Sequence, residues 1–292
     1  MPTSYRRHAN KHSKRKTHRR KAQRRILHGL LLVFAALMLC FGLFLWKAAL
    51  ELNAPAEPAV SSAEDDFRPV VGESFTSCPP YRVAIDAGHG GNDPGARGVV
   101  EEKQVTAATA AALLQWLEED SNYIPLQTRE SFDETATPAQ RAATASAQSP
   151  QLLLSIHGNS AANGSTAAGF ECYPAVPGRT WHQESFYFAR LLAGGMQSIG
   201  AKLRGRGGVR YIYYLENDQK QLVENTYTQV RPERSFTLLE DVDCPAVLAE
   251  QCFVTNAEDV EHFGSEEGCK AVARIYYEAI CAYFGTEPLP TE

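Results

Sequence analysis

Several histidines and glutamates stand where apolar runs end, in positions that could support metal chemistry. His89 and His157 each come shortly after an apolar run, and Glu250 ends a third one. Between the two histidines, Glu101 and Glu102 open a helical pattern. Two histidines and a glutamate are ligands typical of a catalytic zinc site, in which a fourth position is left for water and a second carboxylate can act as a base. These residue types therefore suggest a hydrolytic zinc centre.

The elements that must position these side chains are predicted from the hydrophobic pattern. Short apolar or alternating runs predict five strands, and apolar residues at three- and four-residue spacing predict four long helices. Strands that alternate with helices indicate an α/β domain with a largely parallel sheet, whose ligand site lies beyond the carboxyl ends of the strands. The expected strands are 81–86, 123–128, 152–156, 169–173 and 245–250, and the expected helices are 103–119, 138–148, 183–199 and 267–284.

Each candidate residue also has an ordinary explanation when it is taken alone. His89 could hydrogen-bond within its own glycine-rich turn, and Glu250 could pair with an arginine. Glu101 and Glu102 could be favourable acids in the first turn of a helix. Because the polar groups stand at equivalent ends of one predicted sheet, however, we expect them to converge on a single crevice.

Four sequence blocks carry these residues, and together they resemble the signature of a known family. The blocks are VAIDAGHGGNDPGARG (83–98), EEKQV (101–105), LLLSIHGNS (152–160) and PAVLAEQCFVTN (245–256). They resemble the zinc-dependent N-acetylmuramoyl-L-alanine amidases, often called type 3 amidases. The resemblance covers about residues 81–284 in the family's block order. It implies a twisted, mostly parallel six-stranded sheet flanked by helices.

The resemblance also implies a role for each site residue. His89, Glu102 and His157 would bind a zinc ion, and Glu250 would be the catalytic general base and acid. The implied reaction is hydrolysis of the peptidoglycan amide bond between the lactyl group of N-acetylmuramic acid and L-alanine. A zinc peptidase that cuts within the stem peptide would keep the same four residues, so that alternative stays open. A non-catalytic wall-binding or activator module is the other alternative, and the complete set of metal and base residues argues against it. No protein regulator is indicated.

Four further residues match positions of the family, and one residue departs from the family's sequence pattern. Thr128, Arg129, Arg141 and Asn256 match, and either packing or substrate contact would explain them. In the E-x-G-F block, Cys252 replaces the usual glycine, so a thiol lies near the predicted site. A cysteine ligand would close the coordination shell and leave no place for water, so we do not expect Cys252 to bind the metal.

The stretch Arg204–Ser235 is longer and more aromatic than the family pattern leads us to expect. Its tyrosines are interleaved with charged residues. We interpret it either as a surface hairpin or as a rim that helps to bind glycan or peptide stems.

The N-terminal part of the chain predicts a membrane anchor and a tether. Residues 1–25 contain eleven Lys/Arg and no acid, and residues 26–46 form a largely apolar run of 21 residues. A helix of that length spans about 31 Å, the thickness of a bilayer's hydrocarbon core, and the basic flank predicts a cytoplasmic N-terminus. Residues 47–80 are rich in proline and acids, which predicts a semi-extended linker. The catalytic domain (81–284) and a short tail (285–292) are then expected outside the cell membrane, at the wall.

Charge argues against a nucleic-acid partner. The net charge of −5 combines the basic arm with residues 26–292, which carry eighteen Lys/Arg against 34 Asp/Glu. An acidic folded domain repels phosphate, so specific nucleic-acid binding is disfavoured.

The seven cysteines contain no C-x-x-C pair, which removes the usual support for zinc ribbons and thioredoxin-type redox sites. Cys40 lies in the apolar run. We expect the other six to be mainly buried free thiols, since cysteine packs as a small hydrophobe, with a disulfide as the alternative.

Overall fold

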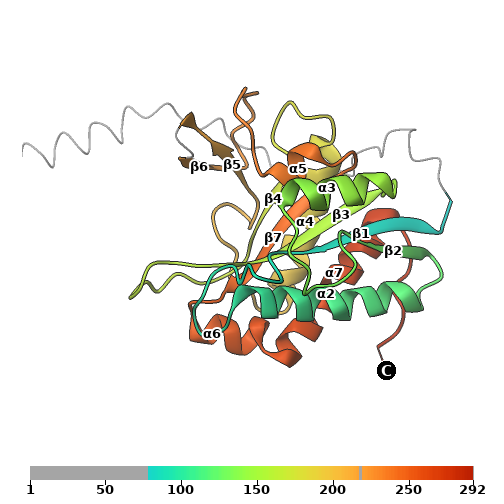
Figure 1. Cartoon of the computed structure of the whole chain (residues 1–292), viewed down its shortest axis with the longest axis horizontal. Helices are drawn as coiled ribbons and strands as arrows, with labels where there is room; N and C mark the ends of the chain where they lie inside the picture. Colours follow the sequence, from blue (N-terminus) through green and yellow to red (C-terminus); the bar gives the residue numbers. More distant parts are fainter. Residues whose placement is uncertain (1–77, 217–218, 292) are drawn as a thin grey trace, which may run out of the picture. The chain divides into compact units, whose positions relative to one another are not determined.

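Figure 1 shows the computed structural model of the chain, which describes residues 78–216 and 219–291. Strands and helices alternate through most of these residues. All five expected strands and all four expected helices are present, and their ends differ from the predicted ones by at most three residues. The strands are β1 (Tyr81–Ala87), β2 (Tyr123–Gln127), β3 (Leu152–Asn159), β4 (Glu171–Pro174), β5 (Arg210–Tyr214), β6 (Lys220–Glu224) and β7 (Ala246–Phe253). The helices are α2 (Glu102–Glu119), α3 (Pro138–Ala147), α4 (His182–Ser198), α5 (Thr237–Asp241), α6 (Ala257–Asp259), the π-helix η2 (Val260–Gly264) and α7 (Glu266–Phe284).

The main sheet has five strands in the order β2-β1-β3-β7-β4. The first four are parallel, and β4 pairs antiparallel with β7 at one edge. The inner strands β1, β3 and β7 are apolar and almost wholly buried, as expected for strands covered on both faces. Because β1, β3 and β7 are parallel, the residues that follow their carboxyl ends lie at one edge of the sheet.

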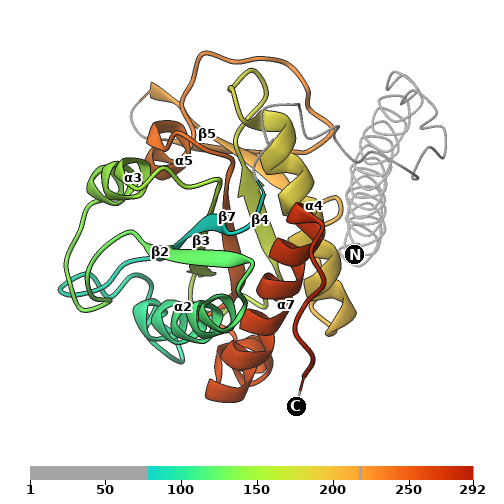
Figure 2. The same ribbon diagram turned by 90° about the vertical axis from the view of Figure 1, so that its right-hand side faces the viewer.

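Helices cover both faces of this sheet (Figure 2). Helices α2, α4 and α7 lie on one face, and α3 and α5 lie on the other. Each face has its own buried apolar cluster, the first including Leu113, Phe188 and Tyr276 and the second including Leu153, Leu239 and Leu248. The alternation of side chains along each strand thus divides the core between the two helical layers.

The prediction of six strands in this sheet was wrong by one strand. The chain that runs beside the outer edge of β4 forms only isolated bridges, Phe170 with Leu203 and Cys172 with Val209. Between them the chain turns through Gly205, Gly207 and Gly208, all with positive φ, so no continuous ladder can form. The chain then leaves the edge as β5, which pairs with β6 in a separate two-stranded sheet.

The interpretation of Arg204–Ser235 as containing a surface hairpin is therefore confirmed. Strands β5 and β6 pair antiparallel, with Arg210 opposite Glu224 and Tyr214 opposite Lys220. The three central residues of β5 are buried, whereas the first three of β6 are exposed.

The expected basic arm (1–25), membrane span (26–46) and most of the linker lie outside the described residues. Within 78–216 and 219–291, no helix has the length and hydropathy that crossing a membrane requires. The expected tail begins where Gly285 ends α7 in a left-handed conformation. It returns to that helix, since the Tyr277 hydroxyl accepts from the Leu289 amide and Arg274 donates to the Leu289 carbonyl.

Candidate active site

His89 is projected into a pocket by a turn directly after β1. Its backbone has φ of 61°, a left-handed conformation uncommon for a residue other than glycine. The buried Arg129 guanidinium donates hydrogen bonds to the carbonyls of Ala87 and His89 and so holds this turn in place. Arg129 is therefore a positioning residue for the loop, which favours the packing interpretation of that position.

Glu102 is the first residue of α2, and its side chain is only 5% exposed. Its Oε2 accepts a hydrogen bond from the Ala96 amide at 2.8 Å, and its Oε1 accepts from the Gly158 amide at 3.0 Å. The same Oε1 lies 3.0 Å from both His89 Nε2 and His157 Nδ1. The two backbone donors thus hold the carboxylate between the two imidazoles.

Two glycines make room for this group. A Cβ at Gly88 would come within 2.4 Å of the His157 ring, and a Cβ at Gly95 would come within 2.6 Å of Glu102 Oε2 and of the His89 ring. Real Cβ atoms do not approach other atoms so closely. Packing therefore requires glycine at positions 88 and 95, and the positive φ of Gly95 favours glycine there as well.

His89, Glu102 and His157 form a group that could hold a metal ion. Each offers one donor atom, and the three atoms lie within 4.8 Å of one another. Behind His89, its Nδ1 lies 2.8 Å from Asp93 Oδ2, the kind of carboxylate partner that orients metal-binding imidazoles. The sequence motif contains Asp93, but no role was predicted for it.

The charges within this group are strongly coupled. Burial alone would lower the pKa of His89, but hydrogen bonds to Glu102 and Asp93 and their negative charges raise it to about 9. Burial would raise the pKa of Glu102, but hydrogen bonds to His157 and His89 hold it far below its ordinary value. A carboxylate stabilised by two imidazoles is already arranged to receive a cation, and a metal ion would displace the proton on His89.

Glu250 lies beside this group on the neighbouring strand. It is the register partner of His157 on β3 and of Glu171 on β4, so these side chains emerge on the same face of the sheet. Its Oε2 is buried and has no hydrogen-bond partner among the residues that the structure describes. Burial, and then the charges of Glu102 and Glu171, raise the pKa of the Glu250 carboxyl to about 8. A carboxyl that titrates near neutral pH is suited to proton transfer.

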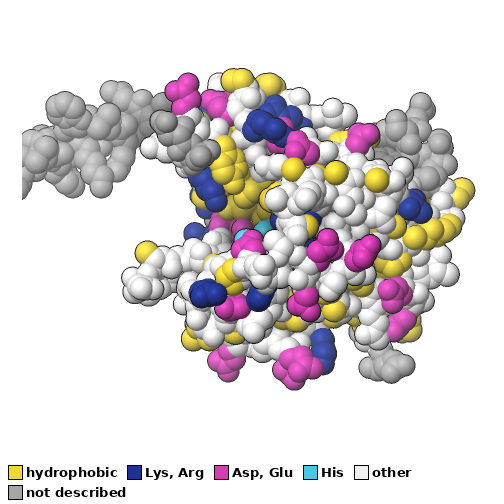
Figure 3. Space-filling view, viewed as in Figure 1, with side chains coloured by type: hydrophobic (Ala, Val, Ile, Leu, Met, Phe, Trp, Pro, Cys, Tyr) yellow, Lys and Arg dark blue, Asp and Glu magenta, His cyan; other side chains and the backbone are white. Residues whose placement is uncertain are grey.

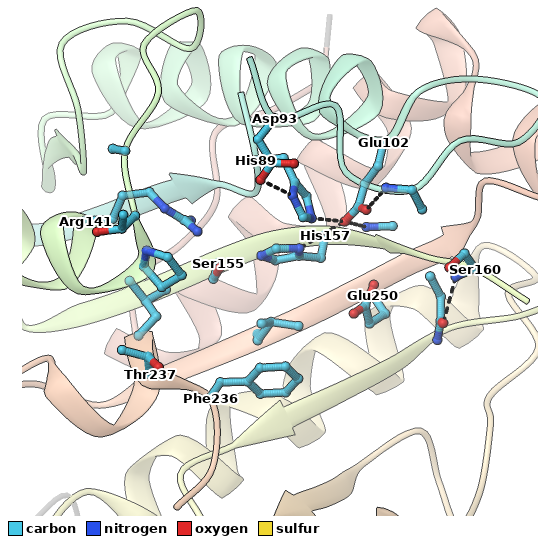
Figure 4. A pocket seen from close by; sticks show the side chains of 18 of the residues that line it. His89, Asp93, Glu102, Arg141, Ser155, His157, Ser160, Phe236, Thr237 and Glu250 are labelled. Atoms are coloured by element: carbon cyan, nitrogen blue, oxygen red, sulfur yellow. Dashed lines mark hydrogen bonds and ion pairs between the residues drawn. The ribbon is translucent and has the colours of Figure 1, made fainter. Parts of the chain in front are cut away.

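The four predicted residues open into a pocket of about 740 Å³. Figure 4 shows the His89, Glu102 and His157 side chains near one another, with Glu250 on the part of the pocket toward Phe236. The remaining wall is formed by α3, the start of α5 and the β5–β6 hairpin. The fold thus brings the predicted residues from four separate segments of the sequence to one pocket.

Comparison with known proteins decides the family. A family model described as N-acetylmuramoyl-L-alanine amidase matches residues 83–282, more than half of the chain. The chain belongs to the N-acetylmuramoyl-L-alanine amidase family. It is 32% identical to the uncharacterized protein YqiI of Bacillus subtilis, over 69% of this chain and 84% of that protein. It is 28% identical to the N-acetylmuramoyl-L-alanine amidase CwlM of Bacillus licheniformis, over 70% of this chain and 68% of that protein.

A solved structure of an N-acetylmuramoyl-L-alanine amidase has a similar fold. The N-acetylmuramoyl-L-alanine amidase from Clostridium difficile 630 aligns with a TM-score of 0.57 and 25% identity. The alignment covers 71% of this chain and 98% of that one. The resemblance stated from the sequence blocks is therefore confirmed, as is the mostly parallel sheet flanked by helices.

A buried ion pair lies below the amidase pocket. Asp86, at the end of β1, is fully buried and accepts hydrogen bonds from Arg141, from Thr128 Oγ1 at 2.6 Å and from Ser155 Oγ at 2.7 Å. Asn256 caps α6, where its side chain accepts from the Asp259 amide at 3.1 Å. These contacts give Thr128, Arg141 and Asn256 structural partners.

Cys252 packs into the amidase core rather than the pocket. The register between β3 and β7 shifts after the pair His157–Glu250, where β7 has one extra residue. This β-bulge turns Cys252 into the apolar cluster beneath α2 and α7, although it is only two residues beyond Glu250. Its Sγ does not belong to the candidate metal group. The six cysteines of the described residues are all free, and five of them are buried.

Proposed function

We propose that this chain hydrolyses the peptidoglycan amide bond between the lactyl group of N-acetylmuramic acid and L-alanine. In this proposal His89, Glu102 and His157 hold a zinc ion, and Glu250 is the general base and acid. The observation that carries the proposal is the convergence of these three donors and an unpartnered carboxyl on one open pocket, in a chain of the amidase family.

The donor set fits zinc. Imidazole nitrogens and a carboxylate oxygen are common zinc ligands, and three protein ligands leave a position for water or substrate, as in catalytic sites. The Asp93 contact to His89 supplies the outer carboxylate that zinc-bound histidines commonly have. When bound, the ion would polarise the amide carbonyl and lower the pKa of a water molecule in the pocket.

Glu250 would move the proton that the reaction requires. Its ionised carboxylate would accept a proton from the attacking water as the water oxygen bonds to the carbonyl carbon. The same group would then give that proton to the nitrogen as the C–N bond breaks. The products are a free lactyl carboxylate on the glycan and a stem peptide with a free amino terminus. The unpartnered Oε2 leaves Glu250 free to form these hydrogen bonds.

The proposal includes a location. Residues 1–25 would be a cytoplasmic arm, 26–46 an uncleaved membrane span and 47–80 a linker, which puts residues 81–284 beside the wall. Its support is the charge and hydropathy of the sequence. The full chain should stay in the membrane fraction after a high-salt wash. Recovery of a soluble chain that begins beyond residue 50 would mean that a signal had been cleaved instead.

Mass spectrometry of digested muropeptides tests the reaction. The purified chain loaded with zinc should release stem peptides that begin with L-alanine, and the E250Q variant should release far fewer. Cleavage within the stem would identify a peptidase instead. Binding to peptidoglycan without any cleavage would indicate a non-catalytic module.

A further inference from the structure

The pocket has an uneven distribution of charge and apolar surface. On the side of the proposed metal ligands it is lined by the acidic residues Asp93 and Glu102, and Glu250 lies from there toward Phe236. The opposite wall is apolar and aromatic, and Figure 3 shows hydrophobic side chains gathered beside the histidines in this hollow. This wall consists mainly of Tyr214, Phe236, Leu238 and Leu248, with Lys220 among the lining residues.

Only one of the two cations that line the pocket is available to a ligand. Arg141 forms an ion pair with the buried Asp86. Lys220, in contrast, is exposed and forms no close ion pair among the residues described, and its charge acts on Glu250 only at longer range, where it opposes the burial that raises the pKa of that carboxyl. Its ammonium group lies over the Tyr214 ring, 5.6 Å from the ring centre. An unpaired cation beside aromatic rings in a pocket is suited to bind an anionic group.

The hairpin that carries Lys220 is anchored to the body of the domain. Lys220 is paired with Tyr214 in the β5–β6 ladder. At the base of the hairpin, Arg210 pairs with Glu171 of β4 at 3.0 Å and with Glu224 of β6 at 3.0 Å. The position of Lys220 at the pocket is thus set by the ladder and by ion pairs to the main sheet.

The chemistry of the substrate indicates which part would meet this cation. In the proposed substrate, the lactyl carboxyl is already part of the amide bond and the N-acetyl sugars are neutral. The free carboxylates therefore belong to the peptide side of the scissile bond. A lone cation on the wall toward Glu250 would attract the peptide stem, whose amine is the leaving group.

We propose that Lys220, with the rings of Tyr214 and Phe236, forms a subsite that binds a carboxylate of the stem peptide. The inference rests on the proposed function and adds the direction in which the substrate lies. The peptide extends toward the β5–β6 hairpin, and the glycan extends away from it.

Two synthetic muramoyl peptides test this subsite. They are identical except that every carboxylate of the stem peptide is free in one and amidated in the other. They are given to the zinc-loaded full chain and to its K220M, K220R and K202M variants. Lys202 is an exposed lysine outside the pocket, so K202M is the matched control.

We expect K220M to raise KM for the free carboxylate by roughly three- to tenfold, with kcat changed less than twofold. K220R should restore most of the loss because it keeps the charge, and K202M should behave as wild type. For the amidated peptide, wild type and K220M should have equal KM. An equal loss on both peptides would overturn the proposal and indicate contact with the glycan or a structural effect. No loss on either peptide would also overturn it.

Direct binding separates this inference from the proposed reaction. Calorimetry with the same two peptides uses the E250Q chain, which should not hydrolyse them, and should show that E250Q prefers the free carboxylate and that E250Q/K220M has no preference. If the wild-type chain cleaves neither peptide, the proposed function fails, yet this binding preference still decides the role of Lys220. Equal binding of both peptides by E250Q would exclude a carboxylate subsite.

Discussion

His157 and Glu250 are register partners on the adjacent parallel strands β3 and β7. A proposed metal ligand and the proposed proton acceptor are therefore fixed relative to each other by one backbone ladder. The β-bulge that follows this pair turns Cys252 into the core, although Glu250, two residues earlier, faces the pocket. The backbone pairing therefore fixes the positions of the two side chains relative to each other.

The first prediction concerns the proposed metal ligands. H89A and H157A should each lose most of the zinc that the wild-type chain retains, because each removes one of three donors. The control is H262A, since His262 is exposed and bonds only to the Glu258 carbonyl. Elemental analysis of protein prepared without added metal gives the zinc content. Full zinc content in H89A or H157A would remove that residue from the ligand set.

Glu101 and Glu102 give a matched pair for the second prediction. Glu102 contacts both imidazoles, whereas the side chain of Glu101 is 36% exposed and lies 3.3 Å from Arg97. Glu101 is the N-cap of α2 and has an extended backbone, whereas Glu102 is the first helical residue, so their side chains point in different directions and cannot serve equally. E102Q should lose zinc and activity, and E101Q should keep both. Loss of zinc and activity in E101Q but not in E102Q would mean that Glu101 is the ligand.

Much of this arrangement could be predicted from the sequence because it depends on local pattern. The buried runs at β1, β3 and β7 are short, apolar and bounded by glycine or proline, so they stand out as central strands. Once the sheet is parallel, the residues at their carboxyl ends must share an edge. His89, His157 and Glu250 were found in this way.

What could not be predicted depends on contacts between distant segments. The ion pair of Asp86 with Arg141 joins residues 55 positions apart, and no local pattern marks it. The role of Asp93 depends on the left-handed turn at His89. The sixth strand was implied by the family and not by a run in this chain, and the glycine-rich turn after Leu203 prevents it here.

The third prediction concerns the ion pair below the pocket. R141A should lower the free energy of unfolding by about 3–5 kcal/mol, because it leaves the Asp86 carboxylate buried without its charge partner. R190A, at an exposed position of α4, should change it by less than about 0.5 kcal/mol. Urea denaturation measures both. A small effect of R141A would show that Thr128 and Ser155 satisfy Asp86 without the arginine.

The raised pKa of Glu250 predicts a dependence of stability on pH in the metal-free chain. The pKa is about 4.5 ordinarily and about 8 in the folded protein, so folding favours the protonated form. The stability linked to this group is fully present below pH of about 4.5 and is lost as pH rises through about 8. Wild type should therefore become less stable relative to E250Q between pH 5 and pH 9. A stability difference between the two proteins that does not vary with pH would contradict the raised pKa.

The last prediction separates metal binding from catalysis. Glutamine at position 250 keeps the size of the side chain but cannot accept a proton from water at neutral pH, and general-base contributions are about 10²–10⁴-fold. E250Q should therefore fold, keep its zinc and release stem peptides from purified peptidoglycan at least roughly a hundredfold more slowly. E258Q, an exposed change on α6, is the control and should be fully active. Loss of zinc together with activity would make Glu250 a ligand and leave the position of Glu102 between the histidines to be explained. Unchanged activity would mean that the carboxyl beside His157 is not the proton acceptor, and the base would then have to come from another residue of the pocket.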